Sequence, residues 1–322
     1  MRLARAALAF LLFLPASVSA ADKPITFCRP DNLVALLGYV AEENGYFKEE
    51  GIAPVFLTAT NAKICQDNLV AGKGDMMFGG EGPFTYLGFR AHPLLLVAQL
   101  GTNPETAVFA RADAGIAAES DLKGKRIGYL PGTVSALYLA RLMEKLKLTA
   151  DDVKLTAMQP PVMPQALRGG MIDAFVMWEP WGDAALKQLG GKAIRLRDPA
   201  LYNYASVFSV TAAIAQNDPA AVRAVLRALL KAEIFVKDHP AETMRIAAKA
   251  VRFDAAVIEK YWPDYDNRIT LNPSLTALLE KNARYIIRDD PNFKDKAVPD
   301  FRPFIDPSFL RAVAPDRVGE GM

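Results

Sequence analysis

Short apolar runs and helical apolar stripes alternate through the first third of the chain. The runs lie at 25–28, 53–59 and 76–78. Between them, residues 32–47 place apolar side chains at helical intervals, and residues 61–70 predict a second helix. Strands that alternate with helices in this way are typical of a parallel sheet covered by helices.

The same order of elements recurs in the middle of the chain. Strands are predicted at 125–130, 153–157 and 172–177, with helices at 134–146 and 164–168. Seven residues of the first segment recur at a constant offset of 98 positions: Leu57, Thr58, Ala59, Leu69, Gly72, Asp75 and Glu81 fall on Leu155, Thr156, Ala157, Leu167, Gly170, Asp173 and Glu179. The chain therefore predicts two lobes built alike, each with an Asp before one strand and a Glu after it.

Two more strand-like segments, 106–111 and 205–213, lie outside this repeat and are predicted to cross between the lobes. Two such crossings form a hinge about which lobes can close. The predicted first lobe comprises residues 21–109 and 208–322, and the second comprises residues 110–207. The C-terminal region is expected to pack on the first lobe through helices at 220–236, 241–251, 255–261 and 274–287.

The first twenty residues predict a secretory signal peptide. Arg2 and Arg5 precede an apolar run at 6–14, and small residues at 18–20 offer a cleavage site. No later run is long enough to span a bilayer, so we expect an exported, soluble, periplasmic protein. Without those two arginines, the 38 basic side chains become 36, equal to the 36 acidic ones, which gives no reason to expect nucleic acid as a partner.

Four motifs in order resemble a known family. They are NGYFKEEGI at 44–52, LVAGKGD at 69–75, DLKGKRIGYLPGT at 121–133 and ALRGGMIDAFVMWEP at 166–180. Together they are similar to the periplasmic binding proteins of the sulfonate, taurine and nitrate ABC importers, a family with relatives that bind pyrimidine precursors of thiamine. The similarity runs from about residue 25 to 198.

The resemblance implies an α/β fold of the two-lobed type II periplasmic binding protein class, with a sheet flanked by helices in each lobe and a helical C-terminal region. It also implies a small-molecule ligand in the cleft and an ABC permease in the inner membrane as partner. We further expect a monomer without a cofactor. The chain departs from the family at Cys28-Arg29-Pro30-Asp31, where uncharged polar residues are expected. Glu81 and Glu179 also suit a bare nitrate ion poorly.

Two helix N-termini are expected to face the cleft and to attract an anion. One opens at Thr60 and Asn61, and the other at Gly132 and Thr133, with Ser135 as a further hydroxyl. The alternative is that these side chains only cap their own helices.

The repeated glutamates are candidates for contact with ligand amines or ring N–H groups. Glu81, beside Gly80, and Glu179 follow strands whose carboxyl ends should border the cleft. Alternatively, each carboxylate bonds backbone N–H groups of its own loop. Trp178 is the favoured wall of the site, ahead of Trp181.

Several other residues are weaker candidates. Cys28 and Arg29 lie in the first loop, where Arg29 can bind an anion or pair with Asp31 at the surface. Phe84 and Tyr86 qualify by proximity alone.

The two cysteines leave two possibilities open. Cys28 and Cys65 can form a disulfide in an exported protein, although spacing alone does not decide it. The alternative is a copper site that joins both cysteines to methionine thioethers, drawn from Met76, Met77, Met158, Met163, Met171 and Met177. No metal site is preferred.

The pattern favours a binding protein over an enzyme. His92 and His239 each precede a proline and are expected to be structural. Two alternatives remain open: an enzyme of pyrimidine-precursor synthesis on the same fold, and a ligand sensor that docks on a membrane kinase.

Overall fold

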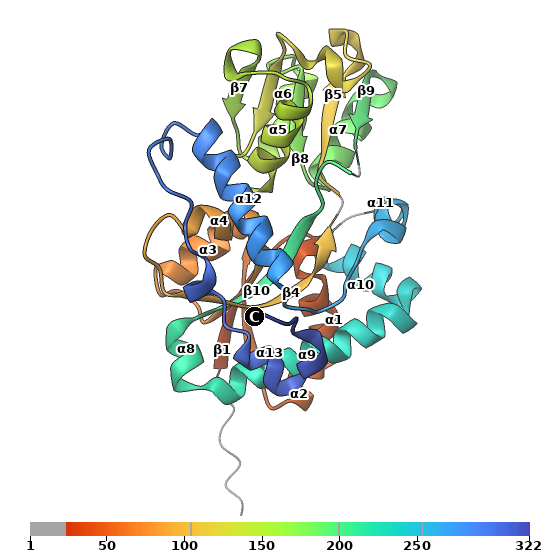
Figure 1. Cartoon of the computed structure of the whole chain (residues 1–322). Helices are drawn as coiled ribbons and strands as arrows, with labels where there is room; N and C mark the ends of the chain where they lie inside the picture. Colours follow the sequence, from red (N-terminus) through yellow and green to blue (C-terminus); the bar gives the residue numbers. More distant parts are fainter. Residues whose placement is uncertain (1–23, 104, 199, 253) are drawn as a thin grey trace, which may run out of the picture.

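The computed structural model describes residues 24–322 except 104, 199 and 253. The predicted signal peptide lies outside these residues. The chain forms two lobes (Figure 1). Each lobe is built around one five-stranded sheet. Within the described residues, no helix combines the length and the apolar character needed to cross a membrane.

The first sheet has the strand order β2-β1-β3-β10-β4. β1 is parallel to β2 and β3, whereas β10 is antiparallel to both β3 and β4. The strands are β1 (Pro24–Pro30), β2 (Ala53–Ala59), β3 (Met76–Gly80), β4 (Leu94–Asn103) and β10 (Tyr204–Thr211).

The second sheet repeats this arrangement in the order β7-β6-β8-β5-β9. β6 is parallel to β7 and β8, and β5 is antiparallel to β8 and β9. The strands are β5 (Ala107–Arg111), β6 (Arg126–Tyr129), β7 (Lys154–Ala157), β8 (Ala174–Met177) and β9 (Ala193–Leu196).

The predicted parallel arrangement holds for three strands of each sheet, but each sheet is mixed, because the two segments predicted to cross between the lobes join the sheets as β5 and β10. β5 and β10 hold equivalent places in the two sheets, and each runs antiparallel to its neighbours. Each follows a passage between the lobes and so enters its sheet from the other lobe. The chain passes from the first sheet to the second after Asn103, and returns after Leu196.

Helices cover both sheets. The predicted helix at 32–47 is divided, because Gly45 takes a positive φ of 74° between α1 and α2. The helices of the first lobe are η1 (Leu33–Ala35), α1 (Leu36–Glu43), α2 (Tyr46–Glu49), α3 (Ala62–Val70), α4 (Glu81–Leu87), α8 (Ala212–Asn217), α9 (Pro219–Asp238), α10 (Pro240–Val251), α11 (Ala255–Tyr261) and α13 (Ser308–Val313). Those of the second are α5 (Val134–Lys145), α6 (Met163–Arg168) and α7 (Trp181–Leu189).

Each lobe has its own core. Phe27 lies 5.5 Å from Phe47 and 6.3 Å from Phe78, centroid to centroid, at the centre of the first lobe. Phe109 and Phe175 lie 5.3 Å apart in the second. Separate cores allow the lobes to move as units.

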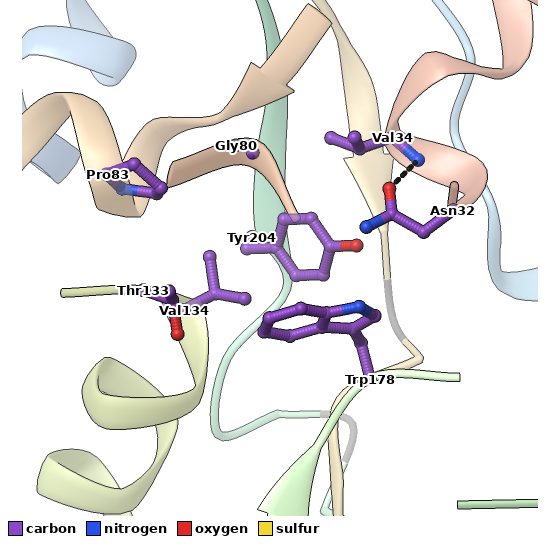
Figure 2. A pocket seen from close by; sticks show the side chains of 9 residues that line it. Asn32, Val34, Gly80, Pro83, Thr133, Val134, Trp178 and Tyr204 are labelled. Atoms are coloured by element: carbon purple, nitrogen blue, oxygen red, sulfur yellow. Dashed lines mark hydrogen bonds between the residues drawn. The ribbon is translucent and has the colours of Figure 1, made fainter. Parts of the chain in front are cut away.

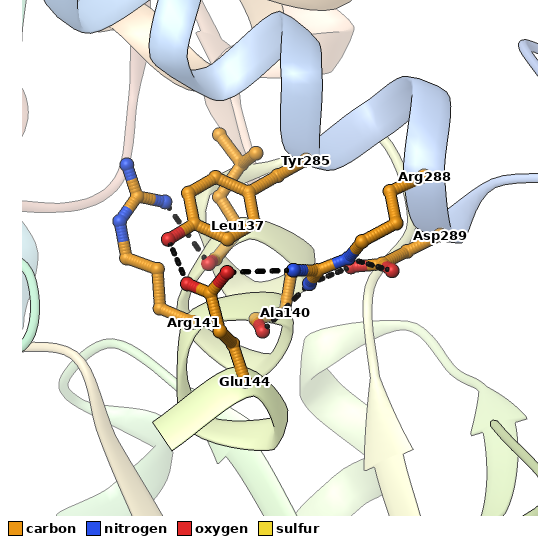
Figure 3. Close-up of polar contacts among 7 residues, drawn as sticks. All are labelled: Leu137, Ala140, Arg141, Glu144, Tyr285, Arg288 and Asp289. Atoms are coloured by element: carbon orange, nitrogen blue, oxygen red, sulfur yellow. Dashed lines mark hydrogen bonds and ion pairs between the residues drawn. The ribbon is translucent and has the colours of Figure 1, made fainter. Parts of the chain in front are cut away.

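Helix α12 (Pro273–Asp289) packs on both lobes, against α4 and α5, so the C-terminal region does not pack on the first lobe alone (Figure 1). Ile286 is buried in the core of the second lobe. Figure 3 shows Arg288, which donates to the Ala140 carbonyl at 3.1 Å and pairs with Glu144 at 3.0 Å. The Tyr285 hydroxyl also donates to Glu144.

Candidate functional site

A pocket lies between the lobes at the carboxyl ends of β3 and β8 (Figure 2). The empty space between its walls is about 290 Å³, a volume that includes open solvent, so little of it is enclosed in this arrangement of the lobes. Its first-lobe residues are Asn32, Val34, Ala62, Gly80, Pro83 and Tyr204, and its second-lobe residues are Thr133, Val134 and Trp178.

The lobes approach each other closely beside this pocket. A Cβ atom on Gly82 would lie 2.9 Å from the backbone nitrogen of Val134, so a glycine is needed there. The start of α4 therefore contacts the start of α5 across the cleft.

Three helical segments begin at the pocket, each with a side chain that caps it. Asn61 accepts from the Ile64 N–H at 3.1 Å, and Thr133 accepts from the Ser135 N–H at 3.2 Å. Asn32 does the same at the start of η1. The caps predicted at Asn61 and Thr133 thus form, and the positive ends of α3 and α5 lie beside the pocket, where they favour an anion.

Trp178 supplies the second-lobe wall of the pocket. It follows β8 directly, and 3% of its surface is exposed. Its indole Nε1 is buried and has no hydrogen-bond partner among the described residues. Because buried donors are nearly always satisfied in folded proteins, this N–H group is available to a ligand acceptor.

A buried carboxylate stands behind the first-lobe wall. Glu105 lies between β4 and β5, and its Oε1 accepts a hydrogen bond from the hydroxyl of Tyr204, whose ring lines the pocket. Its Oε2 has no partner within the described part of the chain. Burial raises the pKa of the Glu105 carboxyl.

Glu81 is fully buried and does not line the pocket. Its Oε1 accepts from the Tyr202 hydroxyl and, at 3.1 Å, from Asn282 Nδ2. Its Oε2 accepts from the Ala205 N–H at 2.9 Å. Burial raises the pKa of the Glu81 carboxyl, while its hydrogen bonds and the nearby Arg141 charge oppose the rise. Contact between Glu81 and a ligand stays a prediction.

Glu179 is equally buried and also lies outside the pocket lining. It forms an ion pair with Arg195, and Tyr261 donates to its Oε1 at 3.1 Å. Its Oε2 accepts from the Asp183 N–H at 2.7 Å, which is the loop contact considered as the alternative. Burial raises the pKa of the Glu179 carboxyl to about 8, and the hydrogen bond from the Asp183 N–H opposes the rise. Ligand contact by Glu179 likewise stays a prediction.

The remaining helix-terminus candidates lie around the pocket rather than in its wall. Thr60 is exposed. Gly132 lies against the Lys63 side chain, since a Cβ there would be 3.3 Å from Lys63 Cε. Ser135 donates to the Val176 carbonyl at 2.6 Å and accepts from the Leu130 N–H at 3.2 Å, which ties α5 to β8 and to the end of β6.

The first loop does not match the expectation for Arg29. Arg29 pairs with Glu42 rather than with Asp31, because its guanidinium lies 3.8 Å from the Phe56 ring centroid and is directed toward α1. Cation–π contact and the ion pair together hold the charge away from the pocket lining.

Cys28 and Cys65 form a disulfide, with Cα atoms 5.2 Å apart. The copper alternative is therefore wrong, because neither sulfur is free to bind a metal. Across the described ranges, no group of three or more His, Cys, Asp or Glu side chains is arranged to hold a metal ion.

The weaker aromatic candidates lie in packed regions. Trp181 packs on the second core, and Phe84 lies in the first core, 5.6 Å from His92. Tyr86 lies 5.6 Å from Phe293. Burial lowers the pKa of His92 to about 4, so this histidine is neutral at pH 7.

No functional prediction from the sequence covers Asn32, Tyr204 or Glu105. Asn32 carries a usable signal, since an Asn between a strand and a helical stripe is a typical cap. For Tyr204 the signal is weaker: it lies at the start of a segment predicted to cross between the lobes. No local signal marks Glu105, because its burial depends on contacts between distant segments.

Known proteins share this sequence and fold. A protein from Brucella abortus named as a binding protein is 25% identical over 243 residues, which cover 71% of this chain and 75% of that protein. One from Escherichia coli named for binding aliphatic sulfonates is 26% identical over 207 residues, 64% of each chain. The crystallised alkanesulfonate-binding protein of Xanthomonas axonopodis, bound to MOPS, has a TM-score of 0.75 at 19% identity and covers 89% of this chain and 99% of that one.

These similarities establish the periplasmic binding protein fold, in agreement with the two mixed sheets described above. A family model described as NMT1/THI5 like matches residues 34–243, which contain most of both sheets and all four sequence motifs in full. This chain belongs to the NMT1/THI5-like family.

Proposed function

We propose that the protein is the substrate-binding component of an ABC importer and holds one small organic molecule in the pocket between its lobes. The observation that carries this proposal is the indole N–H of Trp178, which is buried in the pocket wall without a partner among the described residues. A ligand acceptor would satisfy that donor. The family and the binding functions named for the relatives support the same conclusion.

The pocket favours a ligand with a polar or anionic group and a small apolar body. The N-termini of α3 and α5 provide a positive electrostatic potential. Trp178 and Val134 offer apolar surface beside them. Sulfonates fit this description, as do pyrimidine-like molecules that accept hydrogen bonds through ring nitrogens; nitrate would use the positive potential alone.

Binding would be coupled to lobe closure. A ligand that touches Trp178 in one lobe and Asn32 or Tyr204 in the other favours the closed arrangement, because it binds that state better than the open one. In this proposal the protein is a periplasmic monomer, exported by its signal peptide, and its closed form docks on a permease in the inner membrane.

An enzyme on the same fold is the rival hypothesis. The most plausible nucleophiles are already engaged: Cys28 and Cys65 are bonded to each other, and the Ser135 hydroxyl is bonded on both sides. Product formation from a bound pyrimidine or sulfonate by the purified protein would decide for the enzyme.

The test is a thermal-shift screen of protein that has been unfolded and refolded to remove bound ligand. The compounds are sulfonates, nitrate, aromatic acids and pyrimidines. A ligand at a hundred times its dissociation constant should add about 2.7 kcal/mol of stability and raise the melting temperature.

Trp178→Phe provides the site-specific arm, because it removes the N–H group and keeps an aromatic wall. We expect it to weaken binding about tenfold, the value of one hydrogen bond. Trp181→Phe, outside the pocket, is the matched control and should bind normally. Equal affinity in both variants would contradict the placement of the ligand against Trp178.

A further inference from the structure

Three polar groups from different segments point into the same part of the pocket (Figure 2). The Trp178 indole N–H is a donor without a partner among the described residues. The Oδ1 of Asn32 accepts from the Val34 N–H at 3.2 Å, which leaves the amide NH₂ of Asn32 as a donor. The third group is the hydroxyl of Tyr204.

The Tyr204 hydroxyl has a fixed polarity. Its single proton is donated to Glu105 Oε1, which does not line the pocket. Oε1 can accept that proton whether Glu105 is ionised or carries a proton on Oε2. The remaining lone pairs of the Tyr204 oxygen therefore act as acceptors.

The surroundings of Glu105 allow it to fix the direction of the Tyr204 hydroxyl proton. Its side chain is 2% exposed, so water does not compete for Oε1. It lies in the first passage between the lobes, whereas Tyr204 begins β10 just after the second passage. The hydrogen bond thus joins the two hinge segments and holds the Tyr204 ring against Gly80, where a Cβ would be 3.5 Å from the ring.

We infer that Glu105 is a specificity-determining residue, which makes Tyr204 an acceptor beside the donors Asn32 and Trp178. This inference rests on the proposed function. The pocket then selects molecules in which an acceptor group, such as a sulfonate oxygen or a ring nitrogen, has an N–H or O–H donor close by. A molecule of the same shape with a methyl group in place of that donor offers no hydrogen bond to the lone pairs of the Tyr204 oxygen in the closed pocket.

Two probe pairs test this selection by isothermal titration calorimetry. 2-Aminoethanesulfonate is compared with propane-1-sulfonate, in which a methyl group replaces the ammonium. 4-Amino-2-methylpyrimidine is compared with 2,4-dimethylpyrimidine. For at least one pair we expect the wild type to prefer the member with the donor by about 10- to 100-fold, the penalty for one unmatched buried acceptor.

Three variants trace that preference to Glu105. Tyr204→Phe removes the acceptor and should bring the affinity ratio close to one. Glu105→Met removes the partner of the Tyr204 proton, which is then free to turn into the pocket, and the ratio should fall to one or invert. Glu105→Gln keeps a carbonyl acceptor for that proton and should retain most of the preference, a rescue that a purely structural role would not predict.

Tyr202→Phe is the matched control, because it removes another tyrosine hydroxyl bonded to a buried glutamate, outside the pocket lining. It should keep the wild-type ratio. If the wild type binds a pair but Tyr204→Phe and Glu105→Met leave the ratio unchanged, the inference is overturned and the proposed function stands. If the wild type binds none of the four probes, both the sulfonate or pyrimidine form of the proposed function and this inference fail.

Discussion

The two lobes neutralise equivalent glutamates by different means. Glu81 follows β3 and Glu179 follows β8, and both are buried at the pocket edge of their sheets. Glu81 accepts hydrogen bonds from neutral donors, and its Oε1 and Oε2 make no direct ion pair among the described residues. Glu179 is in direct contact with the guanidinium of Arg195.

The repeat therefore preserves the position of the carboxylate but not its partners. In each lobe, however, one hydrogen-bond donor to the glutamate comes from a distant segment. For Glu81 this segment is the passage between the lobes, and for Glu179 it lies outside the second lobe. Glu81 bonds Tyr202, which lies between β9 and β10, and Glu179 bonds Tyr261 of α11. The shared feature is a carboxylate that ties a strand exit to a distant segment.

Glu179→Gln should show the largest effect of this comparison. It leaves Arg195 buried without its charged partner, and breaking a buried ion pair costs about 3–5 kcal/mol. Urea unfolding measures the loss. The double variant Glu179→Met with Arg195→Met removes both charges and should cost less than Glu179→Gln alone. A stability close to wild type, combined with lost affinity for a ligand, would instead assign Glu179 to ligand contact.

Glu81→Gln should cost less, about 1–3 kcal/mol. The glutamine amide keeps one acceptor oxygen, but its NH₂ group replaces the other. That NH₂ group faces either the Ala205 N–H or the Asn282 amide, both of which are donors, so one buried donor loses its partner. Arg141 keeps its bond to the Leu137 carbonyl.

The exposed Glu144 provides the control for Glu81→Gln, because Glu144→Gln alters a solvated pair and should cost at most about 1 kcal/mol. If Glu81→Gln lowers the free energy of unfolding as much as Glu179→Gln does, then the charge of Arg141 stabilises the buried Glu81 carboxylate more than its neutral hydrogen-bond donors do.

The sequence predicted elements where one stretch of chain determines them. The strand at 53–59 matches β2 to the residue, because its apolar side chains and flanking Gly51 are local signals. The direction of β5 and β10 was not predictable in this way. It depends on which sheet each strand joins after the chain has crossed between the lobes.

Site residues, too, were predictable only where one stretch of chain determines their position. Gly80, Thr133 and Trp178 line the pocket, and all three follow from strand ends or helix starts. Glu81 and Glu179 lie at the predicted strand exits, yet their oxygens are satisfied by Tyr202 and Tyr261, which are distant in sequence. A local pattern places a carboxylate but cannot show what it meets.

Asp75 and Asp173 offer the finest comparison between the lobes. Asp75 accepts the Thr26 N–H at 2.8 Å, and Asp173 accepts the Arg126 N–H at 2.9 Å, in the same place of each sheet. Asp173 alone of this pair also contacts a guanidinium, that of Arg126, at 2.6 Å and 3.0 Å.

Asp173→Asn should therefore cost about 1–2 kcal/mol near pH 7, with the Arg126 pair weakened by its partial exposure. Hydrogen bonding to Arg126 lowers the pKa of Asp173 in the folded state. The contribution is thus present above the unfolded pKa, near 4, and is lost as pH falls through the folded value. Urea unfolding at pH 7 and pH 3 should show a larger gap between wild type and Asp173→Asn at pH 7. Asp75→Asn removes the same backbone contact in the first lobe, where no arginine among the described residues is involved. The difference in stability loss between the two variants is therefore the contribution of Arg126. Equal losses of unfolding free energy at pH 7 would mean that Arg126 adds nothing to the backbone contact that the two lobes share.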